Sequence, residues 1–138
     1  MKIRINFKMN KKTNPKIDAK TEIVTEIVKL LDDIKSIRIA VIVEGKKDVG
    51  SLRKLGISRI ISLDNRPLYK VVDEIIDNHK TIAILTDLDA EGKKLYSLLQ
   101  HQLKKNGVKV DNQLREFLFK NTKLRQIEGL ASFVASHT

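Results

Sequence analysis

Three short runs of apolar, mostly β-branched residues constrain the fold of this 138-residue chain more than any other feature. They span residues 37–43, 57–63 and 81–86, and a shorter run of the same kind follows at 108–110. Such runs are typical of strands, and the runs at 37–43 and 81–86 suit strands that are buried in a sheet. Segments with helical spacing lie between the runs, at 46–55, 68–79 and 90–106. Strands that alternate with helices predict a Rossmann-like α/β fold: a sheet of about four mostly parallel strands with helices on both faces.

The segments that flank this alternating region are predicted to be an arm and a helix before it, and a helical segment after it. Residues 1–17 are basic and lack a sustained apolar period, so we expect a flexible arm with a short extended piece at 3–7. A helix is expected to begin after Asp18, as its N-cap, and to end near Asp33. Residues 111–138 suit one or two packing helices, with Gly129 as a break. The 138 residues of the chain are enough for one domain, which we place at 18–138.

Charge is distributed unevenly along the chain, whose formal net charge is +10. Residues 1–20 carry seven basic groups against one acid, a net of +6, and residues 101–138 carry seven against three, a net of +4. The middle of the chain, 21–100, is therefore neutral overall. An enzyme that acts on a polyanion needs basic groups to bind the substrate and carboxylates for the chemistry. The basic terminal segments and the neutral middle segment meet both needs, so we expect nucleic acid as the partner. Solubility and a lysine-rich composition are the alternative explanation.

Composition also indicates the cellular compartment of the protein and excludes some classes of metal site. No apolar run approaches the roughly 20 residues needed to span a bilayer, and the basic start lacks the continuous apolar stretch of a signal peptide. We therefore expect a cytoplasmic protein with no membrane partner. The chain has no cysteine, which excludes disulfides and thiolate zinc ligands, and its three histidines are too scattered to suggest a metal cluster.

Acidic residues follow two of the predicted strands at the points where the strands end. Glu44 comes directly after the first run and precedes Gly45, which we expect to permit a sharp turn. Asp87 and Asp89 follow the third run two residues apart, so both can point to one side. The carboxyl ends of parallel strands lie at one edge of a sheet, where ligands bind. We therefore expect three carboxylates to converge there, and their repulsion favours a divalent cation.

A strand that ends in Glu-Gly, followed some forty residues later by a strand that ends in Asp-x-Asp-x-x-Gly, resembles the Toprim domain. The resemblance covers about 37–110, and the EGKKD segment and small size resemble the stand-alone Toprim proteins of archaea and some bacteria. More distantly, the chain is similar to the 5S ribosomal RNA maturase and to the Toprim domains of primases. The resemblance implies that Asp87 and Asp89 bind Mg²⁺, with Mn²⁺ as an alternative, and that Glu44 shares the metal or acts as general acid/base. We expect Gly92, at the end of the second motif, to permit close packing of the next helix.

Basic side chains near these acids are candidates for phosphate contacts. Lys46 and Lys47 stand at the start of a predicted helix, where backbone N–H groups also attract anions, and a solvated surface position is their alternative role. Arg66 leaves the second run at the same edge of the sheet, together with Asp64 and Asn65, for which a plain turn is the alternative. The other candidates are Lys93, Lys120, Lys123 and Arg125.

Three functions are compatible with these features. The first is Mg²⁺-dependent cleavage of RNA phosphodiesters, similar to the maturase, with RNA preferred over DNA. The second is a non-catalytic RNA-binding or ribosome-associated module, whose partner is ribosomal RNA or a ribosomal protein. The third is primase-like nucleotidyl transfer. Topoisomerase activity is not expected, because Tyr69 and Tyr96 lie inside predicted helices. Receiver domains and haloacid-dehalogenase-like phosphatases also carry strand-end aspartates, but a first strand that ends in Glu44 matches them poorly.

Overall fold

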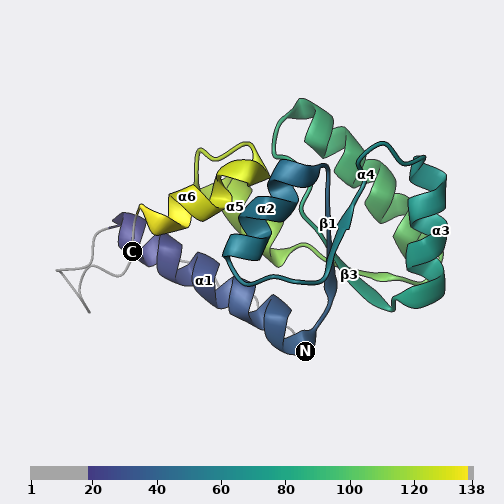
Figure 1. Cartoon of the computed structure of the whole chain (residues 1–138), viewed down its shortest axis with the longest axis horizontal. Helices are drawn as coiled ribbons and strands as arrows, with labels where there is room; N and C mark the ends of the chain where they lie inside the picture. The colour runs from purple at the N-terminus through teal and green to yellow at the C-terminus, as the bar shows by residue number, and fades with distance from the viewer. Residues whose placement is uncertain (1–18, 137–138) are drawn as a thin grey trace.

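The computed structural model describes residues 19–136, which form a parallel β-sheet between two layers of helices (Figure 1). The sheet has the strand order β2-β1-β3-β4, and every neighbouring pair is parallel. The strands are β1 (Ala40–Val43), β2 (Ile60–Ser62), β3 (Thr81–Ile84) and β4 (Lys109–Asp111). The helices are α1 (Ala19–Ile37), α2 (Lys46–Lys54), α3 (Leu68–Asn78), α4 (Ala90–Lys105), α5 (Gln113–Asn121), the 3₁₀ helix η1 (Ile127–Gly129) and α6 (Leu130–Ala135). The predicted α/β fold, with its four strands, is confirmed.

Alternate residues of the central strand β1 pack on opposite faces of the sheet. Val41 and Val43 belong to one apolar core, whereas Ala40 and Ile42 belong to the other. None of the four is more than 3% exposed. The same alternation continues in β3, where the register pairs Ile42 with Ile84. Burial on both faces explains why β1 is apolar throughout instead of alternating between apolar and polar residues.

The helices divide between the two faces of the sheet. The core that contains Val41 also contains residues of α1, α2, α5, η1 and α6, while the other core contains residues of α3 and α4 (Figure 1). In the C-terminal segment, Leu118, Ile127 and Leu130 are fully buried, so its apolar residues build the core as predicted. None of the helices within 19–136 is long and apolar enough to cross a membrane.

The boundaries of the first two elements differ from the prediction. α1 continues to Ile37 instead of ending near Asp33, and β1 begins at Ala40 instead of at residue 37. Arg38 separates the two elements with a φ of 56°, a left-handed conformation that ends the helix. The Ile37 side chain is 55% exposed, so its apolar character does not reflect a buried strand. The arm predicted at 1–17 and the expected N-cap Asp18 lie outside the described residues.

Candidate functional site

The acids predicted from the sequence lie at one edge of the sheet, beyond the carboxyl ends of the strands. Glu44 follows β1, and Asp87 and Asp89 follow β3. Because β1 and β3 are neighbours in the sheet, their exits are adjacent. The structure therefore brings Glu44 to Asp87, and the Oε2 atom of Glu44 accepts a hydrogen bond from the Asp87 backbone N–H at 2.7 Å.

The turn after β1 is held by an aspartate that was not predicted as a site residue. Asp48 of α2 is only 7% exposed, and its Oδ2 accepts a hydrogen bond from the Gly45 backbone N–H at 3.0 Å. This bond satisfies a backbone donor just before the helix and fixes the direction in which α2 starts. Gly45 itself has an extended backbone, with φ −150° and ψ −176°, and no atom lies within 4 Å of where a Cβ would stand. The expected need for glycine in a sharp turn was therefore wrong.

The loop after β3 packs tightly against the first turn of α4. Asp89 is the N-cap of α4, and its Oδ1 accepts a hydrogen bond from the Gly92 backbone N–H at 2.8 Å. The buried hydroxyl of Thr86 donates to the Gly92 carbonyl oxygen at 2.8 Å. A Cβ on Gly92 would stand 1.9 Å from the carbonyl oxygen of Asp87. The local packing therefore requires glycine here, which confirms the prediction made for Gly92.

Each of the three carboxylates is oriented by one backbone hydrogen bond. In addition to the bonds accepted by Glu44 and Asp89, Oδ1 of Asp87 accepts a hydrogen bond from the Ile127 backbone N–H at 2.9 Å. Ile127 lies in η1, so the C-terminal segment takes part in positioning the site. Each carboxylate uses only one of its oxygens in these bonds.

Burial and mutual repulsion disfavour the ionised state of these acids. Burial raises the pKa of the Glu44 carboxyl; the hydrogen bond from Asp87 lowers it in part, and the charges of nearby aspartates raise it further. Burial also raises the pKa of Asp87, where the Ile127 hydrogen bond opposes the shift and Glu128 is among the acids that add to it. The pKa of Asp48 is raised, again chiefly by burial. A site of this kind gains stability from a bound cation.

A buried arginine contacts the backbone of the loop after β3, which carries Asp87 and Asp89. This arginine was not predicted as a site residue either. Arg115 of α5 is 8% exposed, and its guanidinium donates to the carbonyl oxygens of Asp87 at 2.8 Å and Thr86 at 3.3 Å. The guanidinium carbon lies 4.4 Å from the centre of the Tyr96 ring. Burial lowers the pKa of Arg115, while Tyr96 and the site acids raise it. A signal was present in the sequence, since Arg115 stands one turn before the buried Leu118 on the apolar side of its helix.

The side chains of Glu44, Asp87 and Asp89 offer only oxygen atoms as ligands, and such ligands suit a hard cation such as Mg²⁺. Among residues 19–136, however, no group of three or more acidic or histidine side chains is placed to hold a metal ion as it stands. The expected convergence of three carboxylates on one point is therefore not seen. Mg²⁺ commonly uses only one or two protein carboxylates and completes its shell with waters and phosphate oxygens, so the donor chemistry of Glu44, Asp87 and Asp89 still fits it. Their assignment as metal ligands and catalytic groups stays a prediction.

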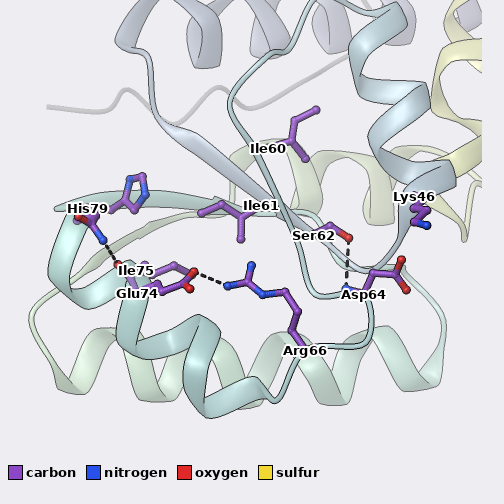
Figure 2. A pocket seen from close by; sticks show the side chains of 10 residues that line it. Lys46, Ile60, Ile61, Ser62, Asp64, Arg66, Glu74, Ile75 and His79 are labelled. Carbon is purple, nitrogen blue, oxygen red and sulfur yellow. Dashed lines mark hydrogen bonds and ion pairs between the residues drawn. The ribbon is translucent and has the colours of Figure 1, made fainter.

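A pocket of about 550 Å³ is lined by residues of β2 and α3, the turn that joins them, and Lys46 at the start of α2. Figure 2 shows Lys46 and Asp64 near one end of this pocket and His79 at the other. Arg66 points across the pocket towards Glu74, with which it forms an ion pair (Figure 2). The structure thus gives Arg66, a predicted phosphate contact, an acidic partner of its own.

Two of the other predicted phosphate contacts lie close to the exit of β3. Lys93 is in the first turn of α4, and its Nζ lies 4.4 Å from the centre of the Phe119 ring. The guanidinium carbon of Arg125 lies 5.1 Å from the same ring centre. The remaining candidates are exposed, two in the first turn of α2, one in α5 and one just after it: Lys46, Lys47, Lys120 and Lys123.

Comparison with known proteins identifies the family. A profile of the Toprim domain matches residues 39–119. The chain belongs to the Toprim domain family. A UPF0292 protein of Methanocaldococcus jannaschii is 36% identical over 115 residues, which cover 77% of this chain and 90% of the relative. A UPF0292 protein of Pyrococcus abyssi is 39% identical over 102 residues, covering 73% and 76%. Among solved structures, a protein of Aquifex aeolicus matches with a TM-score of 0.67 and 31% identity, covering 75% of this chain and 94% of that one.

Membership of the Toprim family confirms the resemblance seen in the sequence, including the likeness to small archaeal proteins. Toprim domains generally bind Mg²⁺, and the family supports a metal-dependent function connected with nucleic acid. The matched region ends at residue 119, whereas the backbone group that holds Asp87 belongs to Ile127. The site of this Toprim protein therefore depends on residues beyond the matched region.

Proposed function

We propose that this Toprim protein is a Mg²⁺-dependent nuclease that cleaves RNA phosphodiesters. The observation that carries the proposal is the hydrogen bond between Glu44 and Asp87, which joins the acidic ends of two neighbouring strands into one site. Exposed cations lie at the start of α2, directly after Glu44, and around Phe119. Acids beside cations suit a reaction at a phosphate, because the cations hold the substrate while the acids serve the chemistry.

The three acids have different roles in this proposal. Asp87 and Asp89 would hold Mg²⁺, or Mn²⁺, and the ion would supply charge neutralisation at the phosphoryl group. Glu44 is fixed at Oε2 by the Asp87 N–H, so Oε1 is the atom that accepts or gives a proton. Its raised pKa brings it closer to neutral pH, which favours general acid/base catalysis.

RNA is the proposed substrate, and we place the protein in the cytoplasm with ribosomal RNA or a ribosomal protein as its partner. The basic ends of the sequence and the exposed Lys46 and Lys47 support binding to a phosphate backbone. Backbone N–H groups at the start of α2 add a second attraction for a phosphate there.

Incubation of the purified protein with end-labelled, structured ribosomal RNA in Mg²⁺ or Mn²⁺ tests the proposal. We expect discrete cleavage products, and we expect them to disappear with EDTA and in Glu44→Gln. The substitution keeps an oxygen that can accept the Asp87 hydrogen bond, so it removes the ionisable group with little change in structure. Cleavage that persists in both controls would come from a contaminating nuclease and would refute the proposal.

A second candidate function is a non-catalytic RNA-binding module. The observation that favours it is the absence, within residues 19–136, of a ready-made group of three metal-ligating side chains. Calorimetric titration of the wild-type protein and Asp87→Asn with Mg²⁺ separates the two functions. The nuclease requires binding that is weakened in Asp87→Asn, whereas RNA binding without cleavage and without Mg²⁺ affinity supports the module.

A further inference from the structure

We infer that Phe119 is a stacking site for an unpaired base of single-stranded nucleic acid, next to the acidic site. This inference rests on the proposed function and specifies the form of the substrate. Phe119 lies near the end of α5, and the residue is 40% exposed. Large aromatic side chains dominate the contact energy of many interfaces, so an exposed ring beside a reactive site is a candidate contact.

Two cations lie against the ring of Phe119. The Nζ atom of Lys93 is 4.4 Å from the ring centre, and the guanidinium carbon of Arg125 is 5.1 Å from it. Both distances are within the range of cation–π attraction. The cluster of Phe119, Lys93 and Arg125 therefore combines a partly exposed aromatic ring with two cations of the kind that bind phosphate.

This cluster is tied to the acidic loop by backbone hydrogen bonds. The N–H of Lys93 donates to the carbonyl oxygen of Asp89 at 3.0 Å. The N–H of Leu88, which stands between the two site aspartates, donates to the carbonyl oxygen of Arg125 at 2.7 Å. A nucleotide bound at Phe119 would therefore be close, along the nucleic-acid chain, to a phosphate bound at Asp87 and Asp89.

The chemistry of the cluster favours single strands over duplexes. Proteins bind single strands by tracking the phosphates with cations and by stacking bases on aromatic rings. In a duplex the base faces are already stacked, so only the phosphates could contact Lys93 and Arg125. A simpler role for the two cations is to cover an exposed ring, and that role predicts no loss of nucleic-acid binding when the ring is removed.

Tyr69 provides a matched control. It is the other exposed large aromatic residue among those the structure describes, with 58% of its side chain accessible. It lies in α3, which packs on the opposite face of the sheet from α5.

The test uses Phe119→Ala and Phe119→Trp in the full chain, with Tyr69→Ala and Tyr69→Trp as controls. Since the natural sequence has no tryptophan, the indole at position 119 is a unique fluorescent reporter. The probes are an oligouridylate of about 12 nucleotides, within the usual range of single-strand site sizes, and an RNA duplex of equal length. Dextran sulfate is a polyanion without bases. Thermal melting of each variant confirms folding.

We expect Phe119→Ala to bind the oligouridylate at least about fivefold more weakly, and the duplex within about twofold of wild type. The fluorescence of Phe119→Trp should be quenched by the oligouridylate and not by dextran sulfate, while both Tyr69 variants behave as their parent. Undiminished oligouridylate binding by Phe119→Ala, with no quenching in Phe119→Trp, overturns the stacking site and leaves the proposed function standing. If the wild-type protein binds none of the nucleic acids, the proposed function and this inference both fall.

Discussion

The Cβ position of Gly92 points at the carbonyl oxygen of Asp87, and the 1.9 Å between them is far below any contact distance. Gly92→Ala must therefore push the first turn of α4 away from the acidic loop. We expect the free energy of unfolding to fall by at least about 2 kcal/mol, because the crowding atom belongs to the backbone and cannot rotate away. Denaturant titration monitored by circular dichroism measures the loss.

Gly50 is a suitable control because it lies inside α2, where no atom outside the neighbouring helix backbone stands within 4 Å of an added Cβ. Gly50→Ala should stabilise the protein by about 0.5–1 kcal/mol, since alanine favours the helix more than glycine does. Equal losses in the two variants would show that crowding at Asp87 is not the reason for Gly92.

The raised pKa of Glu44 makes the stability of the metal-free protein depend on pH. The folded-state pKa lies above the unfolded value, so the folded state binds this proton more tightly. The resulting stabilisation is present below the unfolded pKa and is lost as the pH rises through the folded pKa. Glu44→Gln cannot ionise, so in EDTA we expect it to be more stable than wild type at about pH 7 and to converge with it below about pH 4.

Unfolding titrations across this pH range, in wild type and Glu44→Gln, check the prediction. Glu91, an exposed acid in the first turn of α4, provides the control, and Glu91→Gln should show no gain at neutral pH. A stability difference between Glu44→Gln and wild type that does not change with pH would contradict the assignment of the effect to ionisation of Glu44.

At the level of elements, α5 stabilises the loop after β3 that carries Asp87 and Asp89. Arg115, on its buried side, donates to the carbonyl oxygens of both Thr86 and Asp87. We expect Arg115→Met to lower the free energy of unfolding by about 1.5–3 kcal/mol, the usual range for a buried hydrogen bond to a charged group. Arg115→Lys keeps the charge without the planar fork and should recover only part of the loss.

Denaturant titration measures the stability of these variants, and Mg²⁺ calorimetry tests whether the loop that carries Asp87 is still in place. Lys120→Met removes a cation from the exposed side of the same helix and serves as the control. If Arg115→Met is as stable as Lys120→Met, the two carbonyl contacts contribute nothing.

The alternation of strands and helices could be predicted from the sequence because the helices have a periodic apolar face, whereas a strand buried on both faces, such as β1, is a continuous apolar run. The boundary at Arg38 could not, since a left-handed residue leaves no apolar signature. Glu44 and Asp87 were found because strand ends in a parallel sheet meet at one edge. Asp48 was detectable in principle, because it stands three residues after Gly45, the spacing of a capping acid. The role of Ile127 was not, because it depends on how the C-terminal segment packs.

At the scale of the whole molecule, the two basic ends predict how RNA binding responds to salt. If the ends together contact about 6 phosphates, the logarithm of the affinity should fall with the logarithm of salt concentration at a slope of about −5. Residues 1–17 hold six of the basic groups, so their deletion should reduce the slope to about half.

Binding isotherms with one RNA at several salt concentrations, for the full chain and the deletion variant, measure both slopes. The deletion leaves every core residue that the structure describes in place, so an unchanged thermal midpoint is the control. An unchanged slope would exclude the first seventeen residues from the RNA interface.

The two outer strands of the sheet, β2 and β4, are three residues long each. Strands this short expose few unpaired N–H and C=O groups along the sheet edges, so a second molecule finds little backbone to pair with. Copies of the protein can therefore come close together at high concentration without their sheets joining into fibres.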